Sequence, residues 1–353
     1  MCKLRTQLFA ALRPFCTVFV NATQSLVRRI ECKDAGKWRA ATKYIPAMSL
    51  AVRLLGTSAS RPTVERNVAS VAIVREGETL LVDCGEGTQR QMMRYGVSFG
   101  LADIFFTHFH ADHVIGVIGL LRTMSLQGRT DPLRIWGPRG AQRTMKRAED
   151  FGMDRLTFPI QVEELDAGKV IGRKDYSIVT FPVDHRGSRS LGYALVEEER
   201  KGRFNPELAR EMGIPEGPLW GEIHRGRTVT LDDGRVIEPS ALVGAKRPGR
   251  RVVVTGDTRP CAGTLEASRG ADLLVHESTF GHEEHERAVE TGHSTAREAA
   301  CLARDAGVRS LVLTHFSARY SRDASDLLRE ARECFENTVV GRDGLEVEVG
   351  YPV

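Results

Sequence analysis

Residues 107–113 read Thr107-His108-Phe109-His110-Ala111-Asp112-His113 and directly follow the apolar run Ile104-Phe105-Phe106. It places three imidazoles and one carboxylate at the end of a predicted strand. Neutral imidazole and carboxylate suit Zn²⁺, and Mn²⁺ is an alternative where oxygen ligands contribute. A polar loop that is merely rich in histidine is the competing explanation, but further ligands occur later in the chain. The pattern therefore predicts a metal-dependent hydrolase.

The bulk composition is that of a globular protein. The chain has 353 residues, 41% of them hydrophobic, which is enough for one large core or two modest ones. Its seven cysteines are scattered and include no Cys-x-x-Cys pair, which disfavours both cysteine-ligated zinc and a disulfide framework. We therefore expect a reducing, cytoplasmic location, with no membrane partner.

The first 47 residues differ from the rest. They hold nine Lys/Arg against two acids, whereas the remainder holds 41 basic and 44 acidic residues. They show no clear helix or strand periodicity, and Phe15–Val20 is too short to cross a membrane. Three explanations compete: a disordered basic arm, an organelle-targeting peptide, or a start codon assigned upstream of Met48. We expect residues 1–47 to be a basic extension that is disordered or absent from the mature fold, and residues 48–353 to form the domain.

From Ser49 onward, short apolar runs alternate with turns and helical stretches, which is typical of an α/β protein. The predicted strands are Leu50–Leu55, Ser70–Val74, Thr79–Val82, Asp103–Thr107, Leu133–Trp136, Tyr176–Phe181, Leu191–Val196, Arg251–Val254, Asp272–Val275 and Leu311–Leu313. The predicted helices are Gln89–Tyr95, Val114–Met124, Ala141–Phe151, Thr295–Ala306 and Asp323–Cys334. Residues 197–246 interrupt this rhythm with few apolar positions, so they are either an insertion with a function or a solvated surface loop.

Three more candidate ligands, His185, Asp257 and His315, each lie just past a predicted strand. Strand ends on one edge of a sheet converge, so these residues and the opening motif can share a pocket. The candidates divide into two metal sites: His108, His110 and His185 hold one metal, Asp112, His113 and His315 hold the other, and Asp257 bridges them. A closed structural zinc site needs only four ligands. Two metals roughly 3.5–4 Å apart can activate a shared water, which Asp112 would also orient.

A second motif concerns proton transfer. His276-Glu277-Ser278-Thr279-Phe280 follows a strand, and Gly292-His293-Ser294-Thr295 opens a predicted helix. His293 held by Glu277 is a candidate general acid, because an imidazole can donate a proton near neutral pH. The alternative is a helix cap at Ser294 and Thr295 beside an incidental histidine.

Other polar residues are better explained structurally. Glutamates flank His282 and His285, which favours a solvated helix face, and His224 has no partner ligand nearby in the sequence. Asp83 and Glu86 are expected to shape a turn and support the ligands.

The metal motif of His108, His110, Asp112, His113, His185, Asp257 and His315 resembles that of the metallo-β-lactamase fold. This fold serves many hydrolases, so the resemblance implies the fold and the metals more than the substrate. It implies an α/β structure, a four-layer αβ/βα sandwich.

Finer motifs resemble the ribonuclease Z family, which removes 3′ trailers from precursor tRNA, in its short form. They are Leu55-Gly56-Thr57-Ser58, Arg66-Asn67, Asp83-Cys84-Gly85-Glu86-Gly87-Thr88-Gln89, His276–Phe280 with His293-Ser294-Thr295, and Thr314-His315-Phe316-Ser317-x-Arg319-Tyr320. The resemblance runs from about Met48 to the C-terminus. It implies two Zn²⁺ per subunit (or Mn²⁺), a homodimer, and precursor tRNA as the partner.

The resemblance also gives the insertion a role. In this family a protruding arm with a Gly-Pro-rich motif grips the tRNA elbow and serves the partner subunit. Gly213, Pro215, Gly217 and Pro218 match that motif, and nearby cations are Lys201, Arg203, Arg225 and Arg227. Such contacts position the substrate without reading its sequence. The expected arm is residues 197–246.

One loop departs from the family pattern. Pro-x-Lys-x-Arg-Asn is common there, whereas this chain has Val64 in place of the lysine and an added negative charge at Glu65. The pattern therefore leaves open whether precursors with a mature CCA end are refused. Arg66 in this loop remains a candidate phosphate contact, and Arg319 is a further one beside the metals.

The predicted function is a zinc-dependent endoribonuclease that leaves a 3′-hydroxyl on the tRNA and a 5′-phosphate on the trailer. Asp112, His293 and Glu277 are its expected catalytic residues. One rival is a small-substrate hydrolase on the same fold, such as a cyclic-nucleotide phosphodiesterase or an arylsulfatase-like enzyme, which would have no use for the arm. The other is a non-catalytic RNA-binding protein, which would be expected to have lost several ligands.

Overall fold

The computed structural model describes residues 26–33, 37–44, 49–152 and 155–352. The chain forms two compact units, Met1–Ala47 and Met48–Val353. In the first unit, β1 (Leu26–Lys33) and β2 (Lys37–Tyr44) pair as an antiparallel hairpin from Leu26 opposite Tyr44 to Lys33 opposite Lys37. The sequence had led us to expect no regular element here, so this hairpin is a correction. Residues 1–25, Met48 and Phe15–Val20 lie outside the described residues, and the assignment of the start stays a prediction.

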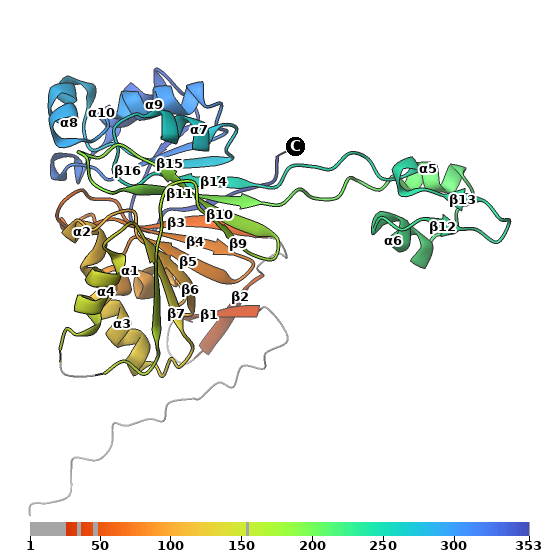
Figure 1. Ribbon diagram of the computed structural model, residues 1–353, viewed down its shortest axis with the longest axis horizontal. Coiled ribbons are helices and arrows are strands. Elements are labelled where there is room, and N and C mark those ends of the chain that lie inside the picture. The colour runs from red at the N-terminus through yellow and green to blue at the C-terminus, as the bar shows by residue number, and fades with distance from the viewer. Residues whose placement is uncertain (1–25, 34–36, 45–48, 153–154, 353) are drawn as a thin grey trace, which may run out of the picture. The chain divides into compact units, whose positions relative to one another are not determined.

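The second unit is built on two seven-stranded sheets (Figure 1). The first sheet has the order β18-β3-β4-β5-β6-β7-β8. Its strands from β5 to β8 run parallel, and the others pair antiparallel. The strands are β3 (Leu50–Gly56), β4 (Ser70–Arg75), β5 (Glu78–Val82), β6 (Leu101–Phe105), β7 (Leu133–Gly137), β8 (Ile160–Glu164) and β18 (Glu346–Glu348). The helices of this half are α1 (Thr88–Tyr95), α2 (Ala111–Val114), α3 (Gly116–Leu126) and α4 (Ala141–Glu149).

The second sheet repeats this arrangement with the order β17-β16-β15-β14-β11-β10-β9. Strands β14 to β17 run parallel, and β9 to β14 pair antiparallel. The strands are β9 (Val170–Gly172), β10 (Tyr176–Pro182), β11 (Leu191–Glu197), β14 (Arg251–Val254), β15 (Leu273–Glu277), β16 (Leu311–Thr314) and β17 (Thr338–Val340). The helical elements are α7 (Ala262–Ser268), η2 (His282–Glu284), α8 (His285–Thr291), α9 (Ala296–Asp305), η3 (Ala318–Tyr320) and α10 (Ser325–Arg332).

Three apolar clusters hold the layers together. One lies between the sheets and includes Leu54, Phe105, Tyr193 and Val254. A second packs α1 and α3 on the first sheet, and a third packs α9 and α10 on the other. Central strands such as β15 are buried on both faces, which explains their continuous apolar runs. The structure confirms the predicted four-layer αβ/βα sandwich.

The insertion is a small structured module. It contains α5 (Pro206–Glu211), α6 (Pro218–His224), β12 (Val229–Thr230), β13 (Val236–Ile237) and η1 (Pro239–Ala241). These elements share their own buried cluster of Ala209, Ile214, Ile223, Leu231, Ile237 and Leu242. Two chain segments join it to the sandwich, and they are bridged at Arg200–Arg247 and Phe204–Val243. It is therefore not an unstructured loop.

The cysteines with described side chains, Cys84, Cys261, Cys301 and Cys334, are free. Cys301 and Cys334 are neighbours, with their Sγ atoms 2.6 Å apart. Burial and the neighbouring thiol raise the pKa of Cys301 to about 11, which favours the protonated thiol. Within the described ranges, the helices all fall short of the length and apolarity that crossing a membrane requires.

Candidate metal centre

All seven predicted ligands meet at one edge of the sandwich, although they come from both halves of the chain. His108 and His110 follow β6, and Asp112 and His113 lie in the short helix α2. His185, Asp257 and His315 follow β10, β14 and β16. The sheets bring their strand ends together here, as the positions of these residues after apolar strands predict.

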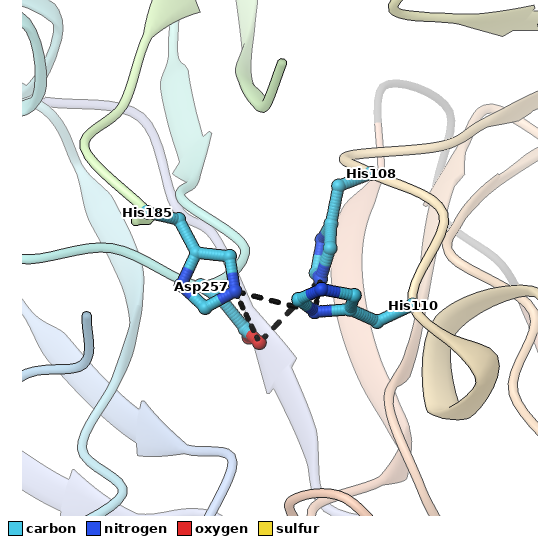
Figure 2. Close-up of side chains that lie close together, drawn as sticks. All are labelled: His108, His110, His185 and Asp257. Carbon is cyan, nitrogen blue, oxygen red and sulfur yellow. Dashed lines mark hydrogen bonds and ion pairs between the residues drawn. The ribbon is translucent and has the colours of Figure 1, made fainter. Parts of the chain in front are cut away.

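The first predicted group contains His108, His110 and His185, and Asp257 joins it. Their ligating atoms all lie within 4.8 Å of one another. Nδ1 of His110 is 3.0 Å from Nε2 of His108 and 3.3 Å from Nε2 of His185. Figure 2 shows His108 and His110 facing His185 and Asp257 from opposite sides of this space.

The second predicted group, Asp112, His113 and His315, satisfies the same distance criterion. Oδ2 of Asp257 is 3.6 Å from Nε2 of His108 and 3.3 Å from Nε2 of His113, and its Oδ1 is 3.2 Å from Nε2 of His315. Asp257 thus lies between the two groups. Asp257, His293 and His315 form a third combination within the same distance.

The donor set fits divalent cations. Oδ1 of Asp257 is buried without a hydrogen-bond partner, which is costly for a carboxylate unless a cation compensates. Nε2 of His113 and Nε2 of His315 face each other at 3.3 Å. Imidazole nitrogens and carboxylate oxygens are the ligand types that Zn²⁺ accepts. These residues therefore suit the binding of metal.

The pKa shifts of the pocket residues also bear on metal binding. Burial, helped by the neighbouring His113, lowers the pKa of His108 well below its ordinary value and keeps its imidazole neutral, the form that ligates metal. Although burial opposes it, neighbouring imidazoles hold the pKa of Asp257 and that of Asp112 below the ordinary range, so both stay ionised. Burial also opposes charge on His113, but the carboxylates of Asp257 and Asp83 raise its pKa well above the ordinary value. The carboxylates of Asp257 and Asp83 therefore favour a positive charge on their side of the pocket.

A layer of hydrogen bonds holds the ligands. Oδ2 of Asp83 accepts from Nδ1 of His113 at 2.8 Å, which confirms the supporting position predicted for Asp83. The carbonyl oxygen of Gly292 accepts from Nδ1 of His185 at 2.8 Å. The backbone N–H of Ser60 donates to Oδ2 of Asp112 at 2.7 Å. These bonds orient the ring nitrogens and the carboxylate toward the pocket.

Backbone conformations outside the usual regions concentrate around this pocket. Ser60, Asp83 and His315 have φ values of 62°, 59° and 60° without being glycine. Such conformations cost about 1–3 kcal/mol each and persist where surrounding contacts enforce them. Gly256 has φ of 65°, and a Cβ there would lie 2.7 Å from the Thr107 side chain. A glycine is therefore required in the turn that brings Asp257 into the pocket.

Glu277 and His293 form the predicted pair beside the metal ligands. Oε1 of Glu277 lies 2.8 Å from Nδ1 of His293. Burial opposes the imidazolium, but the Glu277 carboxylate outweighs it and raises the pKa of His293 to about 9. The helix cap considered as the alternative is also present, because Thr295 and Glu298 form a capping box at the start of α9. The cap and the pair therefore coexist.

Arg66 is engaged by neighbouring groups in this structure, and the phosphate contact expected of it stays a prediction. Its guanidinium donates to the oxygen of Thr57 at 2.8 Å and to the carbonyls of Gly341 at 2.7 Å and Ser321 at 2.9 Å. It also stacks over the ring of Phe316. Through these contacts Arg66 fixes the loop.

Other predicted contact residues lie at the surface. Arg319 pairs with Glu284, which also accepts from the hydroxyl of Tyr320 at 2.6 Å. Val64 is 98% exposed, and Glu65 lies 3.3 Å from Arg322. The loop that departs from the family pattern therefore presents an apolar side chain and a compensated acid to solvent.

The arm carries the Gly-Pro motif between its two helices. Gly213, Pro215 and Gly217 lie between α5 and α6, and Pro218 begins α6. Arg225 and Arg227 both pair with Glu222. Nε2 of His224 lies 3.2 Å from the carbonyl oxygen of Gly202, and its ring is tilted against that of Phe204, which fits the structural explanation for it.

Of the two histidines predicted to lie on a solvated helix face, His282 is exposed, whereas His285 is half-buried with its Nδ1 3.3 Å from Oε1 of Glu298. Sequence reasoning missed Ser60, Thr107 and Thr279 as residues that touch the ligands or the Glu277 pair. Thr107 and Thr279 stood inside the quoted motifs, so their position beside His108 and Glu277 was the available signal.

Comparison with known proteins gives a family. Residues 50–199 match the model of the Anti-Pycsar protein Apyc1, and residues 223–316 match that of the Beta-lactamase superfamily domain. The chain is 67% identical over 303 residues to ribonuclease Z of Gemmatimonas aurantiaca, covering 86% of this chain and 96% of that protein. It is 52% identical over 301 residues to ribonuclease Z of Myxococcus xanthus, covering 85% and 98%.

Solved structures agree. The short form of human tRNase Z has a TM-score of 0.62 and 27% identity, covering 85% of this chain and 99% of that one. Identity of 67% across nearly the whole of a relative far exceeds what a shared fold alone would give. The chain belongs to the ribonuclease Z family of metallo-β-lactamase-fold hydrolases.

Proposed function

We propose that this protein is an endoribonuclease that removes the 3′ trailer from precursor tRNA, using two Zn²⁺ ions per subunit and acting as a homodimer. The observation that carries the proposal is the convergence of seven metal-type ligands beside the Glu277–His293 pair. The names of its relatives, ribonuclease Z and tRNase Z, support the choice of substrate. The products would be a tRNA with a 3′-hydroxyl and a trailer with a 5′-phosphate.

In this proposal, His108, His110 and His185 would hold one metal, Asp112, His113 and His315 would hold the other, and Asp257 would contribute its carboxylate to both. When bound, such metals lower the pKa of a coordinated water and offset the charge that develops on a phosphoryl oxygen. Oδ2 of Asp112, fixed by the N–H of Ser60 at 2.7 Å, can accept a hydrogen bond from the attacking water and orient it.

His293 supplies the proton for the departing 3′ oxygen. Its pKa of about 9 keeps it protonated at neutral pH. Because Nδ1 is engaged by Glu277, Nε2 is the atom left to face the leaving group. The backbone N–H groups of Thr258 and Thr279 donate to the Glu277 carboxylate at 2.9 and 3.1 Å, which holds that carboxylate in place.

The arm grips the tRNA away from the chemistry in this proposal. Its separate small core lets it present a surface without disturbing the metal centre. Positive charge for the phosphates would come from Lys201, Arg203, Arg225 and Arg227. Phosphate contacts of this kind position the tRNA without reading its sequence. Arg319 remains a candidate for a phosphate near the cleavage site, provided that it leaves Glu284.

The test is to incubate the purified protein with a trailer-bearing precursor tRNA, with and without a chelator, and to map both new ends. A 3′-hydroxyl tRNA formed only in the absence of chelator is expected. Metal content measured by mass spectrometry should be two zinc ions per subunit. Cleavage that continues unchanged in the presence of the chelator would contradict the metal assignment.

An arm deletion separates this function from hydrolysis of a small substrate. Residues 202–245 are replaced by a short Gly-Ser linker, which keeps the Arg200–Arg247 bridge and the buried Glu197. We expect precursor tRNA cleavage to fall steeply while hydrolysis of bis(p-nitrophenyl) phosphate is retained. Unchanged tRNA cleavage by the deletion would contradict the substrate assignment.

A further inference from the structure

Two buried threonines make matching contacts on opposite sides of the metal centre. Thr107 lies two residues after the end of β6. It donates its backbone N–H to Oδ1 of Asp83 at 2.8 Å and its hydroxyl to Oδ2 at 2.8 Å. The same hydroxyl oxygen lies 3.0 Å from Nδ1 of His108. Thr107 therefore stands between a carboxylate and a metal-type ligand.

Thr279 repeats the arrangement in the other half of the sandwich, two residues after the end of β15. Its backbone N–H lies 3.1 Å and its hydroxyl 2.8 Å from Oε2 of Glu277. Its hydroxyl oxygen lies 3.0 Å from Nδ1 of His315. Both threonines are buried, so water does not compete for these bonds.

The direction of each bond follows from proton counting. A hydroxyl has one proton, and an ionised carboxylate only accepts hydrogen bonds. The hydroxyl proton therefore points to the carboxylate, and its lone pair accepts the proton on Nδ1 of the imidazole. An imidazole protonated at Nδ1 has its lone pair on Nε2. In His108 and His315, Nε2 is the atom that faces Asp257.

We propose that Thr107 and Thr279 are positioning residues that fix the metal-binding tautomers of His108 and His315, and that Thr279 also couples a metal ligand to the proton donor. The second part rests on the proposed function. The coupling is proposed for Thr279 alone because the two carboxylates have different partners. Asp83 is hydrogen-bonded to the metal ligand His113, whereas Glu277 is hydrogen-bonded to the proton donor His293.

The two threonines therefore differ in one respect and serve as controls for each other. Removing the hydroxyl of Thr107 affects only the metal ligands and not the proton donor His293. Losing the hydroxyl of Thr279 disturbs the ligand His315 and removes one of the bonds that orient Glu277 toward His293. A defect in proton donation is thus expected at Thr279 and not at Thr107.

The experiment uses Thr107→Val and Thr279→Val, which keep the shape and remove the hydroxyl, and Thr107→Ser and Thr279→Ser, which keep the hydroxyl. Zinc affinity is measured by competition with a chromophoric chelator, independently of activity. We expect each valine variant to lose about 10–100-fold in zinc affinity, the usual effect of removing a bond to a ligand. Each serine variant should restore it. Wild-type zinc affinity in both valine variants would overturn the tautomer assignment.

Coupling is tested at saturating zinc with two substrates. The p-nitrophenolate leaving group of bis(p-nitrophenyl) phosphate is stable without a proton, whereas the 3′ oxygen of tRNA needs one. We expect Thr279→Val to lower kcat on precursor tRNA at least about tenfold more than on the small ester, a fraction of what acid–base catalysis contributes. Thr107→Val should lower both equally. If Thr279→Val lowers kcat by the same factor on both substrates, the proposed coupling is wrong.

Two further controls keep the outcomes of these experiments distinguishable. Circular dichroism and thermal unfolding check the fold of each variant; if Thr279→Val does not fold, Thr279→Cys replaces it, because a thiol is a weak donor and acceptor. If the wild-type protein fails to cut precursor tRNA, the proposed function is wrong. The zinc titrations then still decide the tautomer assignment, since they need no RNA.

Discussion

The metal centre and the arm use the chain in opposite ways. At the metal centre, residues from four strand ends and one short helix meet in a largely buried pocket, where their side chains lie in close contact. Asp257, for instance, lies within 3.6 Å of His108, His113 and His315. In the arm, a cluster of six buried residues supports a surface of exposed charges, and two segments are its connection to the sandwich.

This difference separates two tasks. Activating water requires groups held within fractions of an ångström, which a pocket fixed by both sheets provides. Holding a large polyanion requires charge at a distance from the chemistry, which a self-contained module provides. Variants in one region should therefore change the chemical step, and variants in the other should change substrate affinity.

The largest expected effect is at Asp112. Asp112→Ala removes a metal-type ligand and the group proposed to orient water, so cleavage of precursor tRNA should be abolished. Tight binding of the RNA should persist, because the arm is intact; a gel-shift titration measures it. Asp150→Ala is the control, since Asp150 is exposed and pairs with Lys146 alone among the described contacts. If the Asp112→Ala variant still cleaves precursor tRNA, the reaction does not take place in this pocket as proposed.

His293→Ala should lower kcat by about 10²–10⁴-fold, the usual contribution of a positioned acid. His282→Ala, at an exposed histidine, is the control and should leave the rate unchanged. The wild-type pH profile gives a second readout. His293 donates only when protonated, so kcat should be maintained below its pKa of about 9 and fall as the pH rises through that value. In His293→Ala this alkaline fall should disappear, and its persistence would assign the proton to another group.

Glu197 ends β11 and is the first residue of the segment 197–246. Its carboxylate accepts from Nε of Arg75 at 2.8 Å and from Nη2 of Arg250 at 2.6 Å, and both it and Arg250 are fully buried. Glu197→Gln leaves buried arginine charge uncompensated and should cost about 3–5 kcal/mol in the free energy of unfolding. Glu199→Gln, at an exposed residue near Lys246, is the control.

The pH dependence of stability provides a check on the same residue. Burial raises the pKa of Glu197, but the bonds from Arg250 and Arg75 outweigh it and lower the pKa below 4.5. A depressed carboxylate pKa stabilises the fold above the ordinary pKa, and this stability is lost as the pH falls through the folded value. Urea unfolding between neutral pH and pH ~3 should therefore show a shallower loss in Glu197→Gln than in the wild type.

The smallest effect is expected at the base of the arm. The ring of Tyr351 contacts the guanidinium groups of Arg200 and Arg250, whose central carbons lie 3.5 and 4.1 Å from its centroid. Removing cation–π contacts worth about 1 kcal/mol should loosen the arm and raise KM for precursor tRNA about fivefold in Tyr351→Ala. Tyr351→Phe retains the ring and is the control. Hydrolysis of bis(p-nitrophenyl) phosphate should not change, and a parallel loss there would contradict the separation of the two regions.

The secondary structure of the sandwich was predictable where apolar periodicity was strong. The predicted strands Leu50–Leu55 and Tyr176–Phe181 correspond to β3 and β10 within a residue. The edge strands β8, β9, β17 and β18 were missed because they are short or largely exposed, which weakens their apolar signal. The arm elements were missed for the same reason, since their few apolar residues form a core only when α5 and α6 pack together.

The types of the metal ligands and their positions after apolar strands could be read from the sequence alone, because residue type and strand position fix which atoms reach the sheet edge. The pairing of His293 with Glu277 was one of two explanations that the sequence left open, because the two residues lie on different elements. The packing of distant segments, by contrast, brings Arg66 against the hydroxyl of Thr57 and two backbone carbonyls, and places Thr107 and Thr279 between carboxylates and imidazoles. Those contacts join residues whose partners arrive from other strands, so their direction depends on packing that no local pattern encodes.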